Sequence, residues 1–340
     1  MHFLVTGGAG FIGSHLVDSL LADGHEVSVL DNLSTGSLAN LSDALTNPRC
    51  LFIQGSVVDP YVVDDAVDRC DVVVHLAAAV GVELIMSHPL RAFTTNVRGG
   101  EVVLEAAHRY GKKTFMASTS EIYGKNGGDA MPETADRILG PPDVIRWSYS
   151  TSKAVDEILT NLYHSQRGLP TVVARFFNTV GPRQSHAYGM VVPRLVRQAL
   201  TGQPLTVYGD GNQTRCFTHV LDAVRAVRLL LAEEGAIGQT FNIGSPREIS
   251  ILDLADRILE LTGSSSQVRL VPYSEAFQPG YEDMRRRVPD ASKIGRVVGW
   301  SPQLDLDRIL TDTINSVQQS LQNVQGPLEN AAAASYSQGR

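Results

Sequence analysis

Short apolar runs alternate with longer amphipathic stretches through the first half of the chain. The apolar runs lie at His2 to Thr6, Val27 to Leu30, Cys50 to Gln54, Val72 to Leu76 and Lys113 to Ala117. Helical patterns lie between them, as at Ile12 to Ala22 and Thr95 to Arg109. Strands that alternate with helices indicate right-handed crossovers, and continuous apolar runs indicate strands buried on both faces. The pattern therefore predicts an α/β fold with a doubly wound parallel sheet.

The pattern becomes less regular in the second half of the chain. A long helix is predicted from about Tyr149 to Gln166, and a strand follows it at Thr171 to Phe176. Beyond this strand, several helices are broken by short strands such as Pro204 to Tyr208, and a further strand is predicted at Thr240 to Asn242. We interpret this half as a smaller C-terminal lobe that is interleaved with the main domain.

These patterns predict a division of the chain. We expect a main domain over residues 1–180, to which segments from about 215–245 return, and a lobe that occupies most of residues 181–325. Residues 326–340 combine an alanine run with Ser, Gln and Gly and lack periodicity, so we expect a disordered tail there.

Composition narrows the classes of function. The 340 residues are 43% hydrophobic and 19% charged, which is typical of a globular protein. The net charge of -7, without a long basic run, argues against nucleic-acid binding. The nine histidines show no metal-ligand spacing, so no metal site is expected.

The positions of the cysteines and the hydropathy pattern indicate the cellular compartment of the protein. Cys50, Cys70 and Cys216 are scattered and form no CxxC motif, which fits a reducing environment. No apolar run approaches the ~20 residues of a membrane span, and the chain enters an apolar strand at once without a charged leader. We therefore expect a cytoplasmic protein without a membrane partner.

A glycine-rich segment, Gly7-Gly8-Ala9-Gly10-Phe11-Ile12-Gly13, follows the first strand and opens the first helix. In this context glycines allow a tight turn and let backbone N–H groups approach a pyrophosphate at the helix N-terminus. Asp31 ends the second strand, where its carboxylate can accept from both ribose hydroxyls and would repel a 2′-phosphate. The segment therefore predicts NAD rather than NADP as the cofactor.

Small and apolar residues at the ends of the next strands extend this predicted site. Ser56 and Val57 could flank the adenine, while Ala77 and Ala78 either leave room for the cofactor or simply pack. The residues expected to contact NAD are Gly7, Gly10, Phe11, Ile12, Gly13, Asp31, Asn32, Ser56, Val57, Leu76, Ala77, Ala78, Tyr149 and Lys153.

Two groups of polar residues suggest a catalytic site. Tyr149 and Lys153 lie four residues apart, on one face of the predicted helix. A free tyrosine has a pKa near ~10, and a neighbouring cation stabilises its phenolate and favours a role as a base. Thr119, Ser120 and Glu121 follow the strand that ends at Ala117, and ligands bind at the carboxyl ends of such strands. Glu121 could act on the substrate or merely cap the following turn.

Taken together, these motifs resemble those of the extended short-chain dehydrogenase/reductase family, which comprises nucleotide-sugar epimerases, dehydratases and decarboxylases. The resemblance covers about residues 1 to 320 and includes Thr6 to Gly13, the Tyr149/Lys153 pair, Asn178 within Arg175 to Arg183, and Asp222 after Arg215. It implies a Rossmann-type fold, a nucleotide-sugar substrate bound in the C-terminal lobe, and a homodimer through the helices at Thr95 to Arg109 and Tyr149 to Gln166.

The resemblance also implies roles for residues. The expected catalytic residues are Thr119, Ser120, Glu121, Tyr149, Lys153 and Arg287. The expected substrate-binding residues are Val82, Glu121, Asn178, Arg183, Val191, Tyr208, Arg215 and Arg287, and His186 and Tyr188 are further candidates for the sugar pocket. For the arginines, ordinary ion pairing is the alternative.

Three segments favour UDP-glucuronate decarboxylases within the family. The triplet Thr119-Ser120-Glu121 is similar to theirs, although GDP-mannose 4,6-dehydratases share it. The stretch from Gly140-Pro141 to Tyr149 and the sequence Arg287-Val288-Pro289-Asp290 also resemble decarboxylase segments. The chain departs from the xylose-forming decarboxylases at Ala78 to Val82, where these carry a proline-containing loop.

The resemblance implies oxidation of the sugar at C4 by NAD, with Tyr149 taking the hydroxyl proton. The C5 carboxylate of a uronate is then part of a β-keto acid and can leave as carbon dioxide, with Glu121 and Arg287 positioning it and managing protonation at C5. The ketone is then either reduced again or released. Epimerisation at C4 and 4,6-dehydration remain alternatives, and a non-catalytic nucleotide-binding relative is a remote one.

Overall fold

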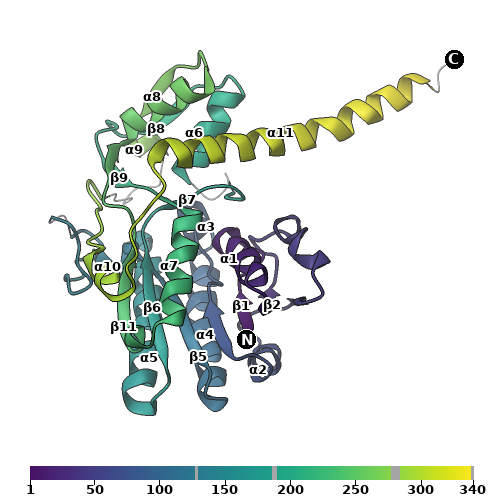
Figure 1. The fold of residues 1–340 in the computed structure, drawn as a ribbon. Helices are drawn as coiled ribbons and strands as arrows, with labels where there is room; N and C mark the ends of the chain where they lie inside the picture. The colour runs from purple at the N-terminus through teal and green to yellow at the C-terminus, as the bar shows by residue number, and fades with distance from the viewer. Residues whose placement is uncertain (127–128, 186–189, 277–283, 338–340) are drawn as a thin grey trace.

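The computed structural model describes residues 1–126, 129–185, 190–276 and 284–337. Its largest element is a seven-stranded parallel sheet in the order β11-β6-β5-β4-β1-β2-β3 (Figure 1). The strands are β1 (His2–Thr6), β2 (Glu26–Asp31), β3 (Cys50–Gln54), β4 (Val72–His75), β5 (Lys113–Thr119), β6 (Thr171–Phe176) and β11 (Gln239–Ile243). Because the order proceeds outward from β1 in both directions, the sheet is doubly wound, as the sequence predicted.

Helices cover both faces of this sheet. The flanking helices are α1 (Phe11–Ala22), α2 (Pro60–Asp68), α4 (Pro89–Arg109), α5 (Ser148–Arg167) and α7 (Val220–Ala232). Side chains alternate between the faces along each strand, so Val5 packs with α1 and α7 while Leu4 packs with α2 and α4. Both faces are therefore apolar, which explains the continuous apolar runs in the sequence.

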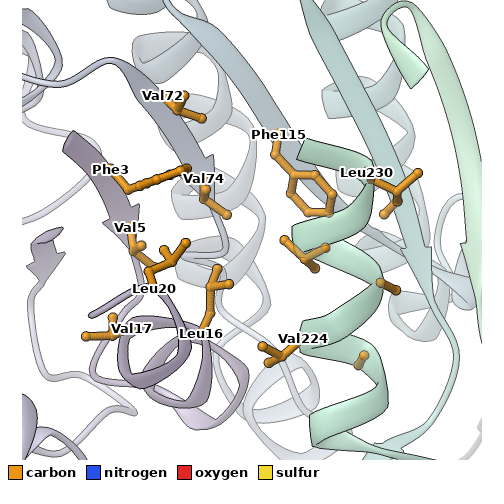
Figure 2. Packing of buried hydrophobic residues seen from close by; sticks show 14 of the residues in the cluster. Phe3, Val5, Leu16, Val17, Leu20, Val72, Val74, Phe115, Val224 and Leu230 are labelled. Atoms are coloured by element: carbon orange, nitrogen blue, oxygen red, sulfur yellow. The ribbon is translucent and has the colours of Figure 1, made fainter. Parts of the chain in front are cut away.

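The core beneath α1 and α7 is shown in Figure 2. Leu16 and Leu20 lie one helical turn apart on α1 and point to the sheet, and Val224 faces it from α7. Val5 and Val74 present the sheet side of the same cluster, and all five side chains are buried. The helix that opens at the glycine segment is thus fixed to the sheet through its apolar stripe.

A second group of elements lies at one end of the large sheet (Figure 1). Its helices are α6 (Val191–Leu200), α8 (Ile251–Thr262), α9 (Tyr273–Ala276) and α11 (Leu306–Ser337). Its strand pairs are β7 (Thr179–Val180) with β10 (Thr218–His219), β8 (Leu205–Tyr208) with β13 (Val268–Val271), and β9 (Thr214–Cys216) with β12 (Glu248–Ser250). These elements form their own apolar cluster, whose members include Leu195, Val207 and Leu254.

Short elements complete the described chain. They are α3 (Val82–Ser87), α10 (Ser292–Val298) and the 3-10 helices η1 (Leu38–Leu41), η2 (Ala44–Thr46), η3 (Ser120–Tyr123), η4 (Ile145–Trp147) and η5 (Glu234–Ala236). Because α7 packs on the large sheet and β11 is one of its strands, the chain returns to the sheet after entering the second group. The division of the chain into a main domain and a C-terminal lobe stays a prediction.

The C-terminal segment, for which the sequence predicted a disordered tail, is helical in the structure. Helix α11 is continuous from Leu306 to Ser337 and projects away from the rest of the molecule (Figure 1). Alanine has the highest helix propensity, so the run at Ala331 to Ala334 favours this helix despite its lack of amphipathic periodicity. Over the described residues, no helix combines the length and the apolar composition needed to cross a bilayer.

Candidate active site

The glycine-rich turn between β1 and α1 is closely packed. Gly7 has a φ of +72°, which favours glycine, and a side-chain carbon there would lie 2.8 Å from the backbone of Ala77. A side-chain carbon on Gly13 would lie 2.3 Å from the carbonyl oxygen of Gly7. Gly10 precedes α1 and offers no side chain to cap it. The first N–H groups of a helix lack intrahelical partners, so this end of α1 suits the phosphates of a dinucleotide.

Asp31 connects this turn to the end of β2. One of its carboxylate oxygens accepts a hydrogen bond from Ala9 N at 3.0 Å, and the other accepts from Leu33 N at 2.8 Å. The two bonds fix the carboxylate beside the glycine turn, and its remaining lone pairs can accept from ribose hydroxyls. Asn32 is exposed, and its side chain accepts from Ser34 N within the same turn. These residues fit the nucleoside end of a dinucleotide.

The segment after β4 is held beside the turn. Ala77 N donates to Thr6 Oγ1 at 3.3 Å, and Leu76 N donates to Thr6 O at 3.1 Å. Asn96 of α4 accepts from Ala79 N at 2.7 Å and donates to Ser152 Oγ of α5 at 3.3 Å. Asn96 therefore links the predicted cofactor segment to the helix that carries the predicted catalytic tyrosine. Ala78 lies between these anchored residues, while Ser56 and Val57 follow β3.

The Tyr149 phenol lies in the first turn of α5, next to the end of β5. It is buried and hydrogen-bonded to the Thr119 side chain. Burial raises the pKa of Tyr149 well above its ordinary value, and the negative charges of Glu121 and Asp156 add to this effect. The sequence indicated a cation that lowers this pKa, but the Lys153 ammonium donates to Asp156 Oδ2 at 2.9 Å. Asp156 therefore offsets part of the Lys153 charge that acts on Tyr149.

Glu121 lies between two arginines. Arg146 of η4 is 2.6 Å from Oε2 of the carboxylate, and Arg287 binds Oε1. Burial alone would raise the pKa of Glu121, but the two guanidinium charges outweigh it and lower the pKa to about 2. With both arginines and the glutamate ionised, this group has a net charge of +1. We call Glu121, Arg146 and Arg287 the two-arginine cluster.

The segment that carries Arg287 is anchored from β11. The Asn242 side chain donates to Met131 O at 2.8 Å and to Asp290 O at 3.0 Å, and it accepts from Tyr123 OH at 2.7 Å. Met131 N donates to Val288 O at 2.8 Å. The Asn242 amide therefore uses both its oxygen and its nitrogen to hold the chain that directly follows Arg287.

Comparison with known proteins identifies the family. The NAD dependent epimerase/dehydratase family matches residues 3–244. The chain belongs to this family.

Its relatives include decarboxylases and epimerases. It is 41% identical over 312 residues to the UDP-N-acetyl-alpha-D-glucosaminuronate decarboxylase of Bacillus cytotoxicus, covering 92% of this chain and 96% of the relative. It is 38% identical over 307 residues to UDP-glucuronic acid decarboxylase 3 of Arabidopsis thaliana, covering 90% and 86%. Among solved structures, the UDP-glucuronic acid 4-epimerase of Bacillus cereus in complex with UDP-glucuronic acid and NAD matches with a TM-score of 0.85 and 30% identity, covering 94% and 99%.

Family membership confirms three predictions from the sequence. The fold is a Rossmann-type α/β sheet, the chain is an enzyme of the epimerase/dehydratase family, and NAD is its cofactor. The roles of individual residues stay predictions, and the structure shows which of them it brings together. Thr119, Glu121, Tyr149 and Lys153 lie around the carboxyl end of β5, and Ser120 is buried beside them.

The other predicted substrate-binding residues do not form one cluster in the structure. Arg287 donates to Asn178 Oδ1 at 2.7 Å, so Asn178 directly supports the two-arginine cluster. Arg183 is 2.7 Å from Asp18 of α1, which is the ion pairing that the sequence left open. Val191 begins α6, and Tyr208 ends β8 beneath the Arg194 guanidinium. The side chain of Val82, and His186 and Tyr188 altogether, lie outside the described residues.

Arg215 lies on β9 close to a cavity in the second group of elements. The cavity measures about 380 Å³ and is lined by Gly209, Asp210, Gln213, Tyr273, Met284 and Arg285. Thr214 N donates to Arg285 O at 2.9 Å, and Arg287 follows two residues later. Two residues span at most about 7 Å, so the cavity lies one short segment away from the two-arginine cluster. In the part of the chain that the structure describes, no group of three or more His, Cys, Asp or Glu side chains could hold a metal ion.

Three residues of the site were not predicted as functional. Arg146 contacts Glu121 from 25 positions along the chain, and nothing in the sequence pattern indicates that contact. Asn96 likewise acts through tertiary contacts. Asp156 lies three residues after Lys153 in one helix, so the i, i+3 spacing of opposite charges could have revealed it.

Proposed function

We propose that the protein decarboxylates a UDP-linked hexuronate, either UDP-glucuronate or its 2-acetamido analogue, through a 4-keto intermediate. The observation that carries this proposal is the two-arginine cluster, a buried group of net charge +1 beside Tyr149. A buried excess positive charge favours an anion, and a uronate carries a carboxylate at C6 where a hexose carries a neutral hydroxymethyl group. The decarboxylase relatives act on substrates of this kind.

The chemistry divides between the cofactor and the chain. Bound NAD would supply a hydride acceptor and donor for C4 of the sugar, and the glycine turn with Asp31 would hold it. Tyr149 and Thr119 are placed to bind the oxygen at C4. Once C4 is a ketone, the C5–C6 bond can break, carbon dioxide leaves, and the electron pair becomes an enolate over C4 and C5. Oxidation at C4 also releases the hydroxyl proton, which Tyr149 would accept as a phenolate. The resulting phenol then donates a hydrogen bond to the enolate oxygen and so stabilises it.

Glu121 limits how tightly the arginines bind the carboxylate. Decarboxylation removes the charge at C6, so a carboxylate bound strongly by two free guanidinium groups would be stabilised in the ground state and react slowly. Glu121 neutralises one of the two positive charges and leaves enough charge to bind the substrate. The Glu121 pKa of about 2 keeps it ionised in the free protein, so protonation at C5 requires water or a change in that pKa on binding.

The cavity lined by Tyr273 and Arg285 would hold the nucleotide. An aromatic ring and a cation can bind a base and a phosphate, and the segment from Arg285 to Arg287 leads to the cluster that would hold the uronate. A nucleoside diphosphate sugar has charged and aromatic groups in this same order. The arrangement therefore supports a nucleotide-linked substrate.

The test is incubation of the protein and NAD with UDP-glucuronate, UDP-N-acetylglucosaminuronate, UDP-glucose and dTDP-glucose, followed by mass spectrometry and NMR. We expect loss of carbon dioxide from one or both uronates. Unchanged mass with inversion at C4 of a uronate would make the protein a 4-epimerase, as in the Bacillus cereus neighbour. Loss of water from a hexose would make it a dehydratase. Either result overturns the proposal.

Neighbouring arginines provide a matched pair of variants. Arg287 binds Glu121, whereas Arg286 pairs with Glu248 at 2.6 Å on the partly exposed surface. Arg287→Met should abolish uronate turnover, while Arg286→Met should retain it because a surface ion pair contributes little. Equal loss in both variants would show that the segment, rather than the cluster, matters.

We also propose a homodimer through α4 and α5. These helices pack side by side, and α5 exposes Ile158 and Leu162 one turn apart, at 54% and 43% of their surface. Paired apolar side chains on an outward helix face suit a second copy of the same bundle. Analytical ultracentrifugation of the protein and of an Ile158→Glu/Leu162→Glu variant tests this, since only the former should sediment as a dimer.

A further inference from the structure

Arg194 of α6 is a partly buried arginine, and no carboxylate pairs with it among the residues that the structure describes. Burial lowers the pKa of Arg194, and the group that opposes this effect is the Tyr208 phenol rather than an acid. The Nε atom is buried, and no described residue forms a hydrogen bond with it. Removing a guanidinium from water without a counterion is unfavourable, so other contacts have to favour its position.

The Arg194 guanidinium contacts two residues of strand β8. Its Nη1 donates to Thr206 O at 2.8 Å and also to Thr206 Oγ1. The guanidinium carbon lies over the Tyr208 ring, 4.4 Å from its centroid, which is within the range of a cation–π interaction. Thr206 and Tyr208 are two residues apart, so their side chains leave the strand on the same face. Arg194 therefore covers this face of β8 and connects it to α6.

Gln198, one turn after Arg194 on α6, shows what the edge of β8 requires. It accepts from Thr206 N at 3.0 Å and donates to Thr206 Oγ1 at 3.0 Å. In the described chain β8 and β13 form a two-stranded sheet, so the helix supplies side-chain partners along the other edge of β8. A glutamine is sufficient for such bonds, whereas the planar charged group of an arginine also stacks on an aromatic ring. The Tyr208 ring is therefore the contact that explains an arginine at position 194.

Tyr208 adjoins the wall of the cavity in the second group of elements. Gly209 follows it and lines the cavity, and Gln213, which also lines it, donates to Tyr208 O at 2.8 Å. Gly209 has a φ of +71°, and a side-chain carbon there would lie 2.6 Å from the ring of Tyr273, another lining residue. The end of β8 is thus packed directly against the cavity, and a displacement of Tyr208 would move its wall.

We propose that Arg194 is a positioning residue of the nucleotide site, which fixes the Tyr208 ring and with it the cavity wall that receives a uridine nucleotide. This rests on the proposed function, which places the nucleotide of the substrate in this cavity. An aromatic ring binds a base by stacking, and a ring already held by a cation loses less conformational freedom when the base arrives. Arg194 belongs to the cavity and not to the two-arginine cluster, so it acts on substrate binding and not on the chemical step.

Calorimetric titration of the NAD-bound protein with UDP tests this role without turnover. Arg194→Met keeps the aliphatic stem and removes the guanidinium, and we expect UDP to bind about tenfold more weakly. Tyr208→Leu should weaken binding to a similar extent, and Tyr208→Phe should not, because the ring is kept. The Arg194→Met/Tyr208→Leu double variant should lose no more than Tyr208→Leu alone, since Arg194 acts through the ring. Additive losses would show that Arg194 acts on the nucleotide directly and would overturn the proposal.

Arg197→Met is the matched control, because Arg197 lies three residues later on the same helix but is exposed. It should leave the affinity for UDP unchanged. An equal loss of affinity in Arg197→Met would assign the effect to the overall charge of the helix and would overturn the proposal.

Steady-state kinetics distinguish this inference from the proposed function. With a uronate substrate, Arg194→Met should raise KM and retain kcat. Turnover by this variant with an unchanged KM would overturn the inference and leave the proposed function standing. Weaker binding of UDP by Arg194→Met, in a protein that releases no carbon dioxide from either uronate, would overturn the proposed function and leave the inference standing.

Discussion

The Arg287 guanidinium donates a hydrogen bond to Asn178 Oδ1 across 2.7 Å. Asn178 in turn donates from its amide nitrogen to the carbonyl oxygen of Cys216 at 2.9 Å. Rotating the amide would break both bonds, so its orientation is fixed by Arg287 and by Cys216 of β9. The Arg287 guanidinium, which binds Glu121, is thus oriented by a neutral side chain that connects the two groups of elements.

Two replacements of Asn178 should distinguish the effect of the orientation of Arg287 from the effect of the net charge of the two-arginine cluster. Asn178→Ala removes one charge-assisted hydrogen bond, and we expect kcat/KM for the uronate to fall about tenfold. Asn178→Asp keeps the acceptor but cancels the net charge of +1. The KM for the uronate should therefore rise above that of Asn178→Ala, while the fold is retained. Steady-state kinetics of both variants measure this, and equal KM values would contradict the role of net charge.

Arg146 provides a second test of the same charge. Arg146→Met leaves Glu121 with Arg287 alone and a net charge of zero, so we expect turnover to fall about 100-fold. Adding Glu121→Gln restores a net charge of +1. The double variant should therefore bind the uronate more tightly than Arg146→Met, as measured by calorimetry, although both should turn it over slowly. Weaker binding by the double variant would show that Glu121 itself contacts the substrate.

Acid should destabilise the protein through His75. Its pKa falls from 6.5 to about 3 on folding because the ring is buried beside Lys153, and Nδ1 lies 2.8 Å from Thr6 Oγ1. Between these values the unfolded chain binds a proton that the folded chain does not, so stability is lost as the pH falls below 6.5. We expect a loss on the order of 2 kcal/mol between pH 6.5 and 5.

Thermal unfolding of the protein and of His75→Asn across this range tests the assignment. The variant should lose less stability on acidification. A residual slope should remain, because burial also lowers the pKa of His15 and His219. Identical slopes in the two proteins would show that His75 is not the group responsible.

Asp31 should set the choice between the two nicotinamide cofactors. Asp31→Ser removes the carboxylate that would repel a 2′-phosphate, so the ratio of NADP to NAD affinity should rise about tenfold or more. Absolute NAD affinity should fall, because the bonds to Ala9 N and Leu33 N are lost as well. Fluorescence titration with both reduced cofactors measures this ratio, and a ratio that does not change would place the discrimination elsewhere.

The regular part of the fold could be predicted because its signals are local. The strands His2–Thr6, Cys50–Gln54 and Thr171–Phe176 have the predicted limits, since each is an apolar run bounded by turn residues. Helix α4 instead begins at Pro89, six residues before the predicted start at Thr95, because proline is well suited to the first turn. The tail helix was not predicted, since no amphipathic pattern marks it.

The candidate site likewise contains residues that local motifs predict and residues that only tertiary contacts bring in. Glycine turns and the Tyr149/Lys153 spacing are local motifs, and their predicted neighbours Thr119 and Glu121 do lie beside them. The partners that determine the charges are not local: Arg146 reaches Glu121 from another loop. Arg287 was predicted from a resemblance, but its place between Glu121 and Asn178 depends on how Asn242 holds the neighbouring chain.

Strand β11 has a consequence for how the chain can fold during synthesis. It completes the large sheet beside β6, whose residues Val172, Val173 and Ala174 are fully buried. A fragment that ends at Val180 would present β6 as a bare, apolar edge, which favours association with other chains. The sheet can close only after Ile243 has left the ribosome, so the nascent protein must keep that edge from aggregating until then.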